Sequence, residues 1–131
     1  MKNLAIIFMS ISSFFACKKD HDHVTENKIV LNWAQPLDGS TVKLGDTLRI
    51  EGNATFPTEL HGYEVVVTRA SDSLTPLFSE DADIHATDLQ ISKKWKNSLS
   101  DSTRLLVKIE IAKDHSGSNN EVFRRIVWAV K

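Results

Sequence analysis

The chain has 131 residues and a formal charge of −1, with 16 Lys or Arg against 17 Asp or Glu. This balance argues against nucleic-acid binding, which requires a basic patch or stripe. A single cysteine excludes a framework of internal disulfides. The length suits one domain with one hydrophobic core.

Residues 1–16 have the pattern of an export signal. Lys2 supplies a positive charge, residues 4–16 carry none, and a small residue, Ala16, precedes Cys17. The uncharged run is shorter than the roughly 20 apolar residues that a membrane-spanning helix needs. We therefore predict that residues 1–16 are cleaved and that Cys17 becomes the lipid-bearing first residue of the mature protein. The alternative is an ordinary signal peptide with an incidental cysteine.

Residues 17–28 contain the lipidated cysteine followed by a polar tether. The tether, KKDHDHVTEN at positions 18–27, is charged and has no core-forming periodicity. Ten residues reach about 35 Å when fully extended. The tether therefore keeps the following domain close to the membrane that holds the lipid.

From residue 29 to residue 131 the apolar residues recur with a period of two, which indicates β-strands. The clearest run is Leu105, Val107, Ile109 and Ile111. Further runs lie at residues 29–33, 48–50, 63–67, 77–78, 89–91 and 123–130. About seven short strands separated by turn residues predict a single antiparallel β-sandwich of the immunoglobulin-like class, within the all-β proteins. Residues 79–87 have no apolar stripe and are predicted to form a loop or a strand edge.

Three segments carry a resemblance to a known group of proteins. They are WAQPLDGSTVKLGDTLRIEGNAT, LHGYEVVVTRASD and LLVKIEIAKDHSGS. The start of the chain adds Phe14-Phe15-Ala16-Cys17, which resembles a lipobox with Phe in place of the usual Leu. Together these features resemble small Gram-negative envelope lipoproteins with one immunoglobulin-like or fibronectin-like domain of uncharacterised function. The resemblance implies the fold and, because Lys18 and not Asp follows the cysteine, the outer membrane; it supplies no catalytic residues.

Histidines are the candidate metal ligands. Glu59 and His61 are two residues apart, as are Asp83 and His85, so each pair could share one face of an extended strand. His115 follows Asp114 in a predicted loop. A Zn²⁺ or Cu²⁺ site formed by His61, His85 and His115 requires these side chains to converge. The alternative is separate, solvated histidines, because no motif such as HExxH links them.

Aromatic and hydroxyl side chains suggest further sites. Trp33 and Trp128 fall on the apolar side of their strands and are predicted to be in the core. Trp95 lies among lysines and is a candidate platform for a glycan or an acidic partner; alternatively, it closes one end of the sandwich. Three candidate O-glycosylation sites follow Asp, at Thr47, Ser73 and Ser102.

Catalytic signatures are missing from the sequence. There is no Gly-x-Ser-x-Gly motif, and no cysteine is left for thiol catalysis once Cys17 is lipidated. We therefore expect a non-enzymatic binding or interaction module, lipid-anchored at the outer membrane on its periplasmic or outer face. Two alternatives remain open, which are a histidine-based metal-binding lipoprotein and a structural subunit of an envelope complex. The expected partners are the membrane and an envelope protein or glycan.

Overall fold

The computed structural model describes residues 27–131, and this part of the chain is an all-β domain without helices. No segment of this described part is a helix long and apolar enough to cross a membrane. The predicted signal peptide, Cys17 and the tether up to residue 26 lie outside the described residues. The strands are β1 (Val30–Gln35), β2 (Thr41–Lys43), β3 (Thr47–Leu60), β4 (Tyr63–Arg69), β5 (Asp72–Ala82), β6 (Ala86–Lys96), β7 (Thr103–Ile111) and β8 (Glu121–Val130).

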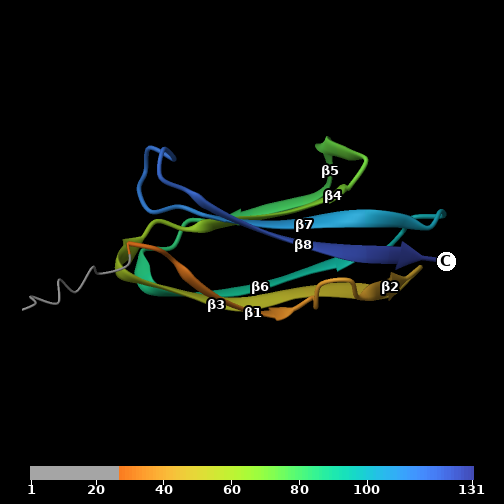
Figure 1. Cartoon of the computed structure of the whole chain (residues 1–131), viewed down its shortest axis with the longest axis horizontal. Coiled ribbons are helices and arrows are strands. Elements are labelled where there is room, and N and C mark those ends of the chain that lie inside the picture. Colours follow the sequence, from red (N-terminus) through yellow and green to blue (C-terminus); the bar gives the residue numbers. More distant parts are fainter. Residues whose placement is uncertain (1–26) are drawn as a thin grey trace, which may run out of the picture.

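The strands form two sheets that pack face to face (Figure 1). One sheet has the order β1-β3-β6 and the other has the order β2-β8-β7-β4-β5. Every pair is antiparallel except β2 with β8, which is parallel. In immunoglobulin terms, β1, β3 and β6 correspond to strands A, B and E, and β8, β7, β4 and β5 correspond to G, F, C and C′. The predicted immunoglobulin-like sandwich is therefore confirmed.

Alternation of apolar and polar residues builds the core between the two sheets. In β7, Leu105, Val107, Ile109 and Ile111 are completely buried, and the residues between them are partly exposed. Strand β3 contributes Leu48, Ile50, Ala54 and Leu60 from the opposite sheet. Because successive side chains on a strand point to opposite faces, this period of two was sufficient to predict which face of β7 is inside.

The number and bounds of the strands differ from the prediction in two places. Residues 27–131 contain eight strands and not about seven, because Thr41–Lys43 pairs with the end of β8. Three residues are too few to show a periodic pattern, so this strand was missed. Residues 79–87 were predicted to be a loop or strand edge, but only residues 83–85 lie outside strands. The pairing of β5 with β4 explains the difference, since a strand at a sheet edge needs no apolar stripe.

The exposure of the three tryptophans tests the positions predicted for them. Trp95 is only 8% exposed and belongs to the hydrophobic core, which excludes the exposed platform and agrees with the alternative that its ring closes one end of the sandwich. Trp128, predicted to be in the core, is 44% exposed because its neighbours Val127 and Ala129 occupy the inward positions of β8. Trp33 is half-buried and packs against the core, in agreement with its prediction.

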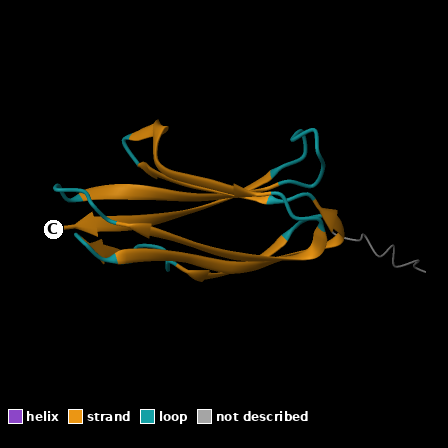
Figure 2. Cartoon of the chain, turned by 180° about the vertical axis from the view of Figure 1, so that it is seen from behind, coloured by secondary structure: helices purple, strands orange, loops and turns teal. Residues whose placement is uncertain are grey.

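Most connections between strands lie at the two ends of the sandwich, while the β4–β5 turn lies on a tip that rises from its sheet (Figure 2). The described chain begins at Asn27 at one end, and the last strand, β8, finishes at the other end (Figure 1). Three connections share the end at which the chain begins: the turn between β3 and β4, residues 83–85 between β5 and β6, and residues 112–120 between β7 and β8. Each of these three connections carries one histidine.

Candidate metal centre

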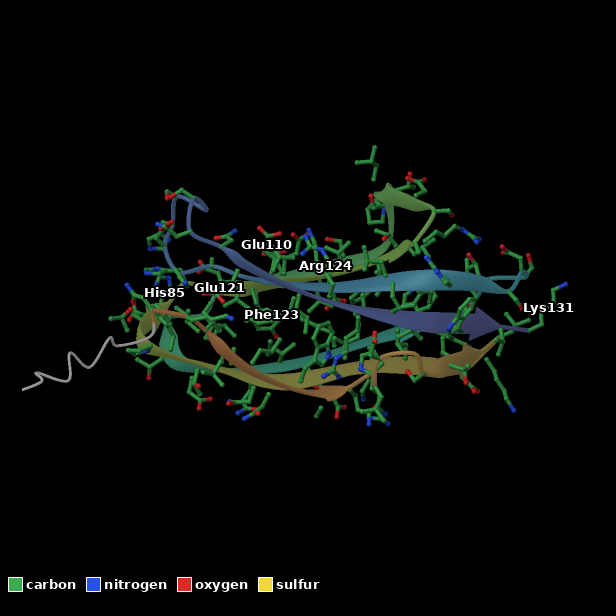
Figure 3. All side chains as sticks on the ribbon, viewed as in Figure 1. His85, Glu110, Glu121, Phe123, Arg124 and Lys131 are labelled. Atoms are coloured by element: carbon green, nitrogen blue, oxygen red, sulfur yellow. The ribbon has the colours of Figure 1, made fainter. Side chains whose placement is uncertain are left out.

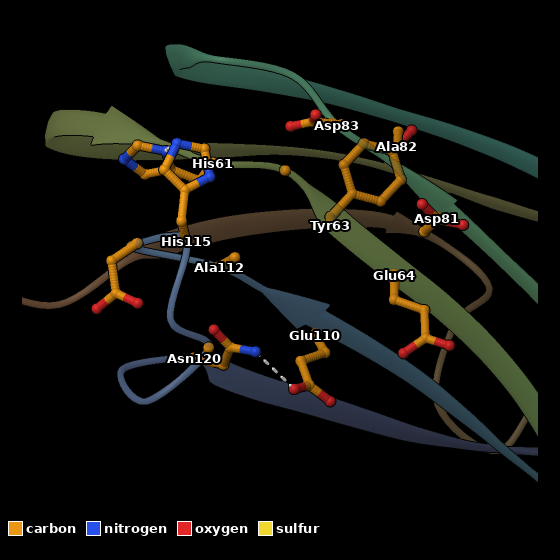
Figure 4. A pocket seen from close by; sticks show the side chains of 13 residues that line it. His61, Tyr63, Glu64, Asp81, Ala82, Asp83, Glu110, Ala112, His115 and Asn120 are labelled. Atoms are coloured by element: carbon orange, nitrogen blue, oxygen red, sulfur yellow. Dashed lines mark hydrogen bonds between the residues drawn. The ribbon is translucent and has the colours of Figure 1, made fainter.

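His61, His85 and His115 converge at the end of the sandwich where the described chain begins. The ring centroids of His61 and His115 are 4.3 Å apart, those of His61 and His85 are 4.8 Å apart, and those of His85 and His115 are 5.0 Å apart. One ring nitrogen from each residue lies within 4.8 Å of the other two. Figure 4 shows the rings of His61 and His115 lying against each other. Residues separated by 24 and 30 positions in sequence thus form one cluster.

The backbone on either side of His61 fixes its position relative to the β7–β8 loop. The His61 amide donates to the Ala112 carbonyl at 2.8 Å, and the Ala112 amide donates to the Gly62 carbonyl at 3.0 Å. Gly62 has a φ of +116°, and a Cβ at this position would lie 2.2 Å from the Ala82 carbonyl oxygen. Only glycine therefore lets the β3–β4 turn approach the end of β5, which leads to His85.

The loop that carries His115 is held by the side chain of Asp114. One carboxylate oxygen of Asp114 accepts from the amide and hydroxyl of Ser116 at 2.9 and 2.6 Å, and the other accepts from Asn119 Nδ2 at 2.7 Å. These bonds from Ser116 and Asn119 keep the pKa of Asp114 below its ordinary value. An Asp that accepts bonds from the next residues of its own turn limits the conformations of the loop. His115 is therefore presented by an ordered loop.

His85 lies between two carboxylates. Its Nδ1 is 3.1 Å from Glu59 Oε1, and its Nε2 is 3.2 Å from Asp83 Oδ1. A carboxylate on one ring nitrogen fixes the ring and makes the other nitrogen a better ligand. If either nitrogen of His85 held a metal, the carboxylate on the other nitrogen would still be in place to orient the ring.

The nitrogen positions suit a tetrahedral ion. His61 Nδ1 and His115 Nε2 are 3.2 Å apart. With Zn–N bonds of about 2.0–2.1 Å, the ligand atoms of a tetrahedral site lie about 3.3 Å from each other. Two histidines already have this separation, and the third needs a side-chain adjustment because the widest separation in the cluster is 4.8 Å. The cluster is half-buried to exposed, so an ion can enter from solvent.

The surroundings of the cluster favour a cation. A cavity of about 310 Å³ beside the histidines is lined by Glu64, Asp81, Asp83, Glu110 and Asp114 (Figure 4). Within residues 27–131, Asp81, Asp83 and Asp114 form no ion pair with Lys or Arg. A concave surface of one charge sign concentrates ions of the opposite sign. Histidine ligands with this acidic border match the chemistry of Zn²⁺ or Cu²⁺.

The other predicted sites do not converge with the histidines. Trp95 is buried in the core and cannot act as a ligand platform. The hydroxyl-bearing candidates Thr47, Ser73 and Ser102 are all exposed, and their glycosylation stays a prediction. Cys17, His21 and His23 lie outside the described residues. Sequence reasoning missed Gly62, although a glycine directly after a histidine in a turn was a usable signal.

Comparisons with known proteins provide no relative for this chain. No family model matches the sequence, and no curated protein matches it. Among solved structures, the ASH/PapD-like domain of human CEP192 (PapD-like domain 7) aligns with 94% of this chain and 96% of its own, at 10% identity and a TM-score of 0.36. Similarity at this level does not indicate a shared function.

Proposed function

We propose that this protein is a lipid-anchored metal-binding module of the cell envelope, which holds Zn²⁺ or Cu²⁺ through His61, His85 and His115. The observation that supports this function is the convergence of three histidines from three separate connections. The adjacent carboxylates Glu59 and Asp83 supply the orienting groups that metal-bound histidines commonly have. The sequence predicts a binding module without naming its ligand, and we propose that this ligand is Zn²⁺ or Cu²⁺.

The anchor and the metal centre belong to the same end of the protein. Lys113 Nζ donates to the Asn27 carbonyl at 2.9 Å, two residues from His115. With Cys17 lipidated at the outer membrane, only residues 18–26 separate the lipid from Asn27. The centre would then face the membrane at a distance of at most about 35 Å. This position suits the capture or transfer of a metal ion beside the membrane.

A calorimetric titration of the full chain with Zn²⁺, and separately with Cu²⁺, tests the proposal. The protein must carry no histidine tag. We expect one ion per chain, with a loss of at least about hundredfold in affinity for His61→Gln, His85→Gln or His115→Gln, because even orienting groups contribute about 10–100-fold. Glu59→Gln is expected to cost about tenfold.

The chain offers its own control for this experiment. The double variant His21→Gln/His23→Gln removes two histidines and leaves the cluster intact, so it should retain the wild-type affinity. The proposal is wrong if the wild type shows no saturable binding tighter than tens of micromolar, or if the tether variant loses as much affinity as the cluster variants.

A further inference from the structure

A second cavity lies on the outer face of the five-stranded sheet, away from the histidines. Its volume is about 260 Å³, and it is lined by Val66, Thr68, Ser73, Leu106, Lys108 and Arg124. The floor comes from β4, β7 and β8, and Ser73 comes from the start of β5. The metal centre contributes no residue to this cavity.

The start of β5 covers the cavity because the β4–β5 ladder is irregular there. Thr68 pairs with Pro76 and the next residue of β4, Arg69, pairs with Asp72, so Ser73 to Thr75 bulge out of the ladder. Asp72 Oδ1 holds this bulge by accepting from the amides of Leu74 and Thr75 at 3.1 and 3.3 Å. Figure 1 shows the β5 tip rising from the sheet. The cavity is therefore bordered by a bulge that hydrogen bonds hold in place, and not by a flat sheet surface.

Thr68, one of the residues that line this cavity, has an unsatisfied hydroxyl. The residue is only 4% exposed, and its Oγ1 has no hydrogen-bond partner within the described part of the chain. A buried polar group without a partner destabilises the fold, so such groups are rare and call for an explanation. A bound ligand that accepts a hydrogen bond from Oγ1 would remove this cost.

Two cations face each other at the same place. Lys108 on β7 pairs directly with Arg124 on β8, and like charges directly opposite on neighbouring strands destabilise a sheet. Lys108 Nζ contacts Glu110 Oε2 at 3.1 Å, whereas the Arg124 side chain forms no ion pair or hydrogen bond with any residue in 27–131. The pKa of Glu110 is lowered by the hydrogen bond from Asn120, by Lys108 and by Arg124. Glu110 thus lies near both cations, and Glu64 faces Glu110 from β4, but Arg124 has no ion pair of its own within residues 27–131.

We propose that this cavity binds a small oxyanion, a carboxylate or phosphate group, through the side chains of Arg124, Lys108, Thr68 and Ser73. The four groups offer a guanidinium, an ammonium and two hydroxyls, all of which can donate hydrogen bonds to anionic oxygens. Figure 3 shows Arg124 on the side of the sheet from which the β5 tip rises. The oxyanion satisfies the Thr68 hydroxyl and neutralises the cross-strand pair of cations.

NMR titration of the full chain with inorganic phosphate, and separately with acetate, tests this assignment. The buffer contains neither phosphate nor carboxylate. We expect saturable shifts confined to the amides around residues 66–75, 108 and 124. Saturation by acetate alone identifies a carboxylate ligand, and saturation by phosphate alone identifies a phosphate ligand; either result supports an oxyanion site. The assignment is overturned if neither anion saturates or if the shifts spread over all basic side chains.

Three variants separate a built site from general charge attraction. Arg124→Gln and Thr68→Val should each weaken binding about tenfold, the loss expected for one charge-assisted hydrogen bond. Thr68→Val should also leave the melting temperature unchanged or raised, because it removes an unsatisfied hydroxyl. Arg49→Gln removes an equal charge from the opposite sheet and should leave binding unchanged. Equal losses for Arg49→Gln and Arg124→Gln, or full binding by Thr68→Val, would overturn the assignment.

Discussion

Gly62 joins the β3–β4 turn to the end of β5 and so determines where His61 lies. Its φ is +116°, and the Ala82 oxygen would lie 2.2 Å from a Cβ at this position, which leaves no room for a side chain. Gly39 is a useful comparison, because its φ is +75° but nothing lies within 4 Å of a Cβ there. A comparison of the two positions therefore distinguishes the cost of a positive φ from the cost of steric overlap.

We predict that Gly62→Ala destabilises the fold by about 3 kcal/mol or more, and that Gly39→Ala costs only about 1–2 kcal/mol. The difference arises because the methyl group added at position 62 must displace the β5 backbone. At position 39 the added methyl group meets no neighbour, and the cost is that of the left-handed conformation alone. Urea unfolding of both variants measures the two free energies. Equal costs for both variants would show that the Ala82 contact does not restrict the turn.

Individual residues also show where sequence reasoning reached its limit. His61, His85 and His115 could be named as candidates from residue type and neighbouring carboxylates, but their convergence depends on which connections share an end. That choice follows from the order of the strands in the two sheets, which a pattern of period two does not specify. Trp95 could be assigned from the sequence either to a ligand platform or to the interior, because neighbouring lysines suggested exposure; alternation along β6 places its ring in the core.

At the scale of elements, one ion pair links β4 to the connection between β6 and β7. Arg69 donates to both carboxylate oxygens of Asp101, at 2.8 and 3.0 Å. This hydrogen bonding lowers the pKa of Asp101 from its ordinary value of 3.8. A carboxylate with a lowered pKa in the folded state stabilises the fold above its unfolded pKa, and this contribution disappears as the pH falls through the folded pKa.

We predict that the Arg69–Asp101 coupling measured in a double-mutant cycle with Arg69→Gln and Asp101→Asn is constant at neutral pH. The coupling should begin to fall as the pH drops below the ordinary Asp pKa of 3.8, and should vanish once the pH is below the lowered pKa of Asp101 in the folded state. Urea unfolding of the four proteins across this pH range supplies the coupling energy. The pair is exposed, so its energy should be at the modest level of surface ion pairs. A coupling that persists at the lowest pH would contradict the assignment to ionised Asp101.

The distribution of apolar residues along each strand explains which strands could be predicted from the sequence. β7 was evident because its four inward residues are all large and apolar. β5 was not fully recognised because it lies at the edge of its sheet, where Ser79, Glu80 and Asp81 are exposed and only backbone pairing to β4 defines the strand. Edge strands are commonly charged in this way, since charges discourage pairing with other molecules.

At the scale of the whole molecule, the lipid at Cys17 would determine the orientation of the domain. The described chain starts at the end that holds the histidines, so an anchor on the tether would direct that end toward the membrane. This arrangement depends on Cys17 and on no other cysteine, because the sequence contains only one.

We predict that Cys17→Ala releases the protein from the membrane fraction, because diacyl modification of the thiol supplies the apolar anchor. Fractionation of cells that express the wild type and the variant measures the change. Zinc binding by the released protein should remain at the wild-type level, which separates anchoring from the metal centre. Retention of Cys17→Ala in the membrane fraction would contradict the lipoprotein assignment.

The first two strands belong to different sheets, since β1 pairs with β3 and β2 pairs with β8. In a lipid-anchored protein, a force between the anchor and the opposite end of the domain would enter the fold at the start of β1 and run along that strand. The inter-strand hydrogen bonds lie across this direction. Such a force loads the whole β1–β3 ladder in shear at once and does not open its bonds one after another. The domain would then be connected to its anchor through inter-strand bonds that share the load.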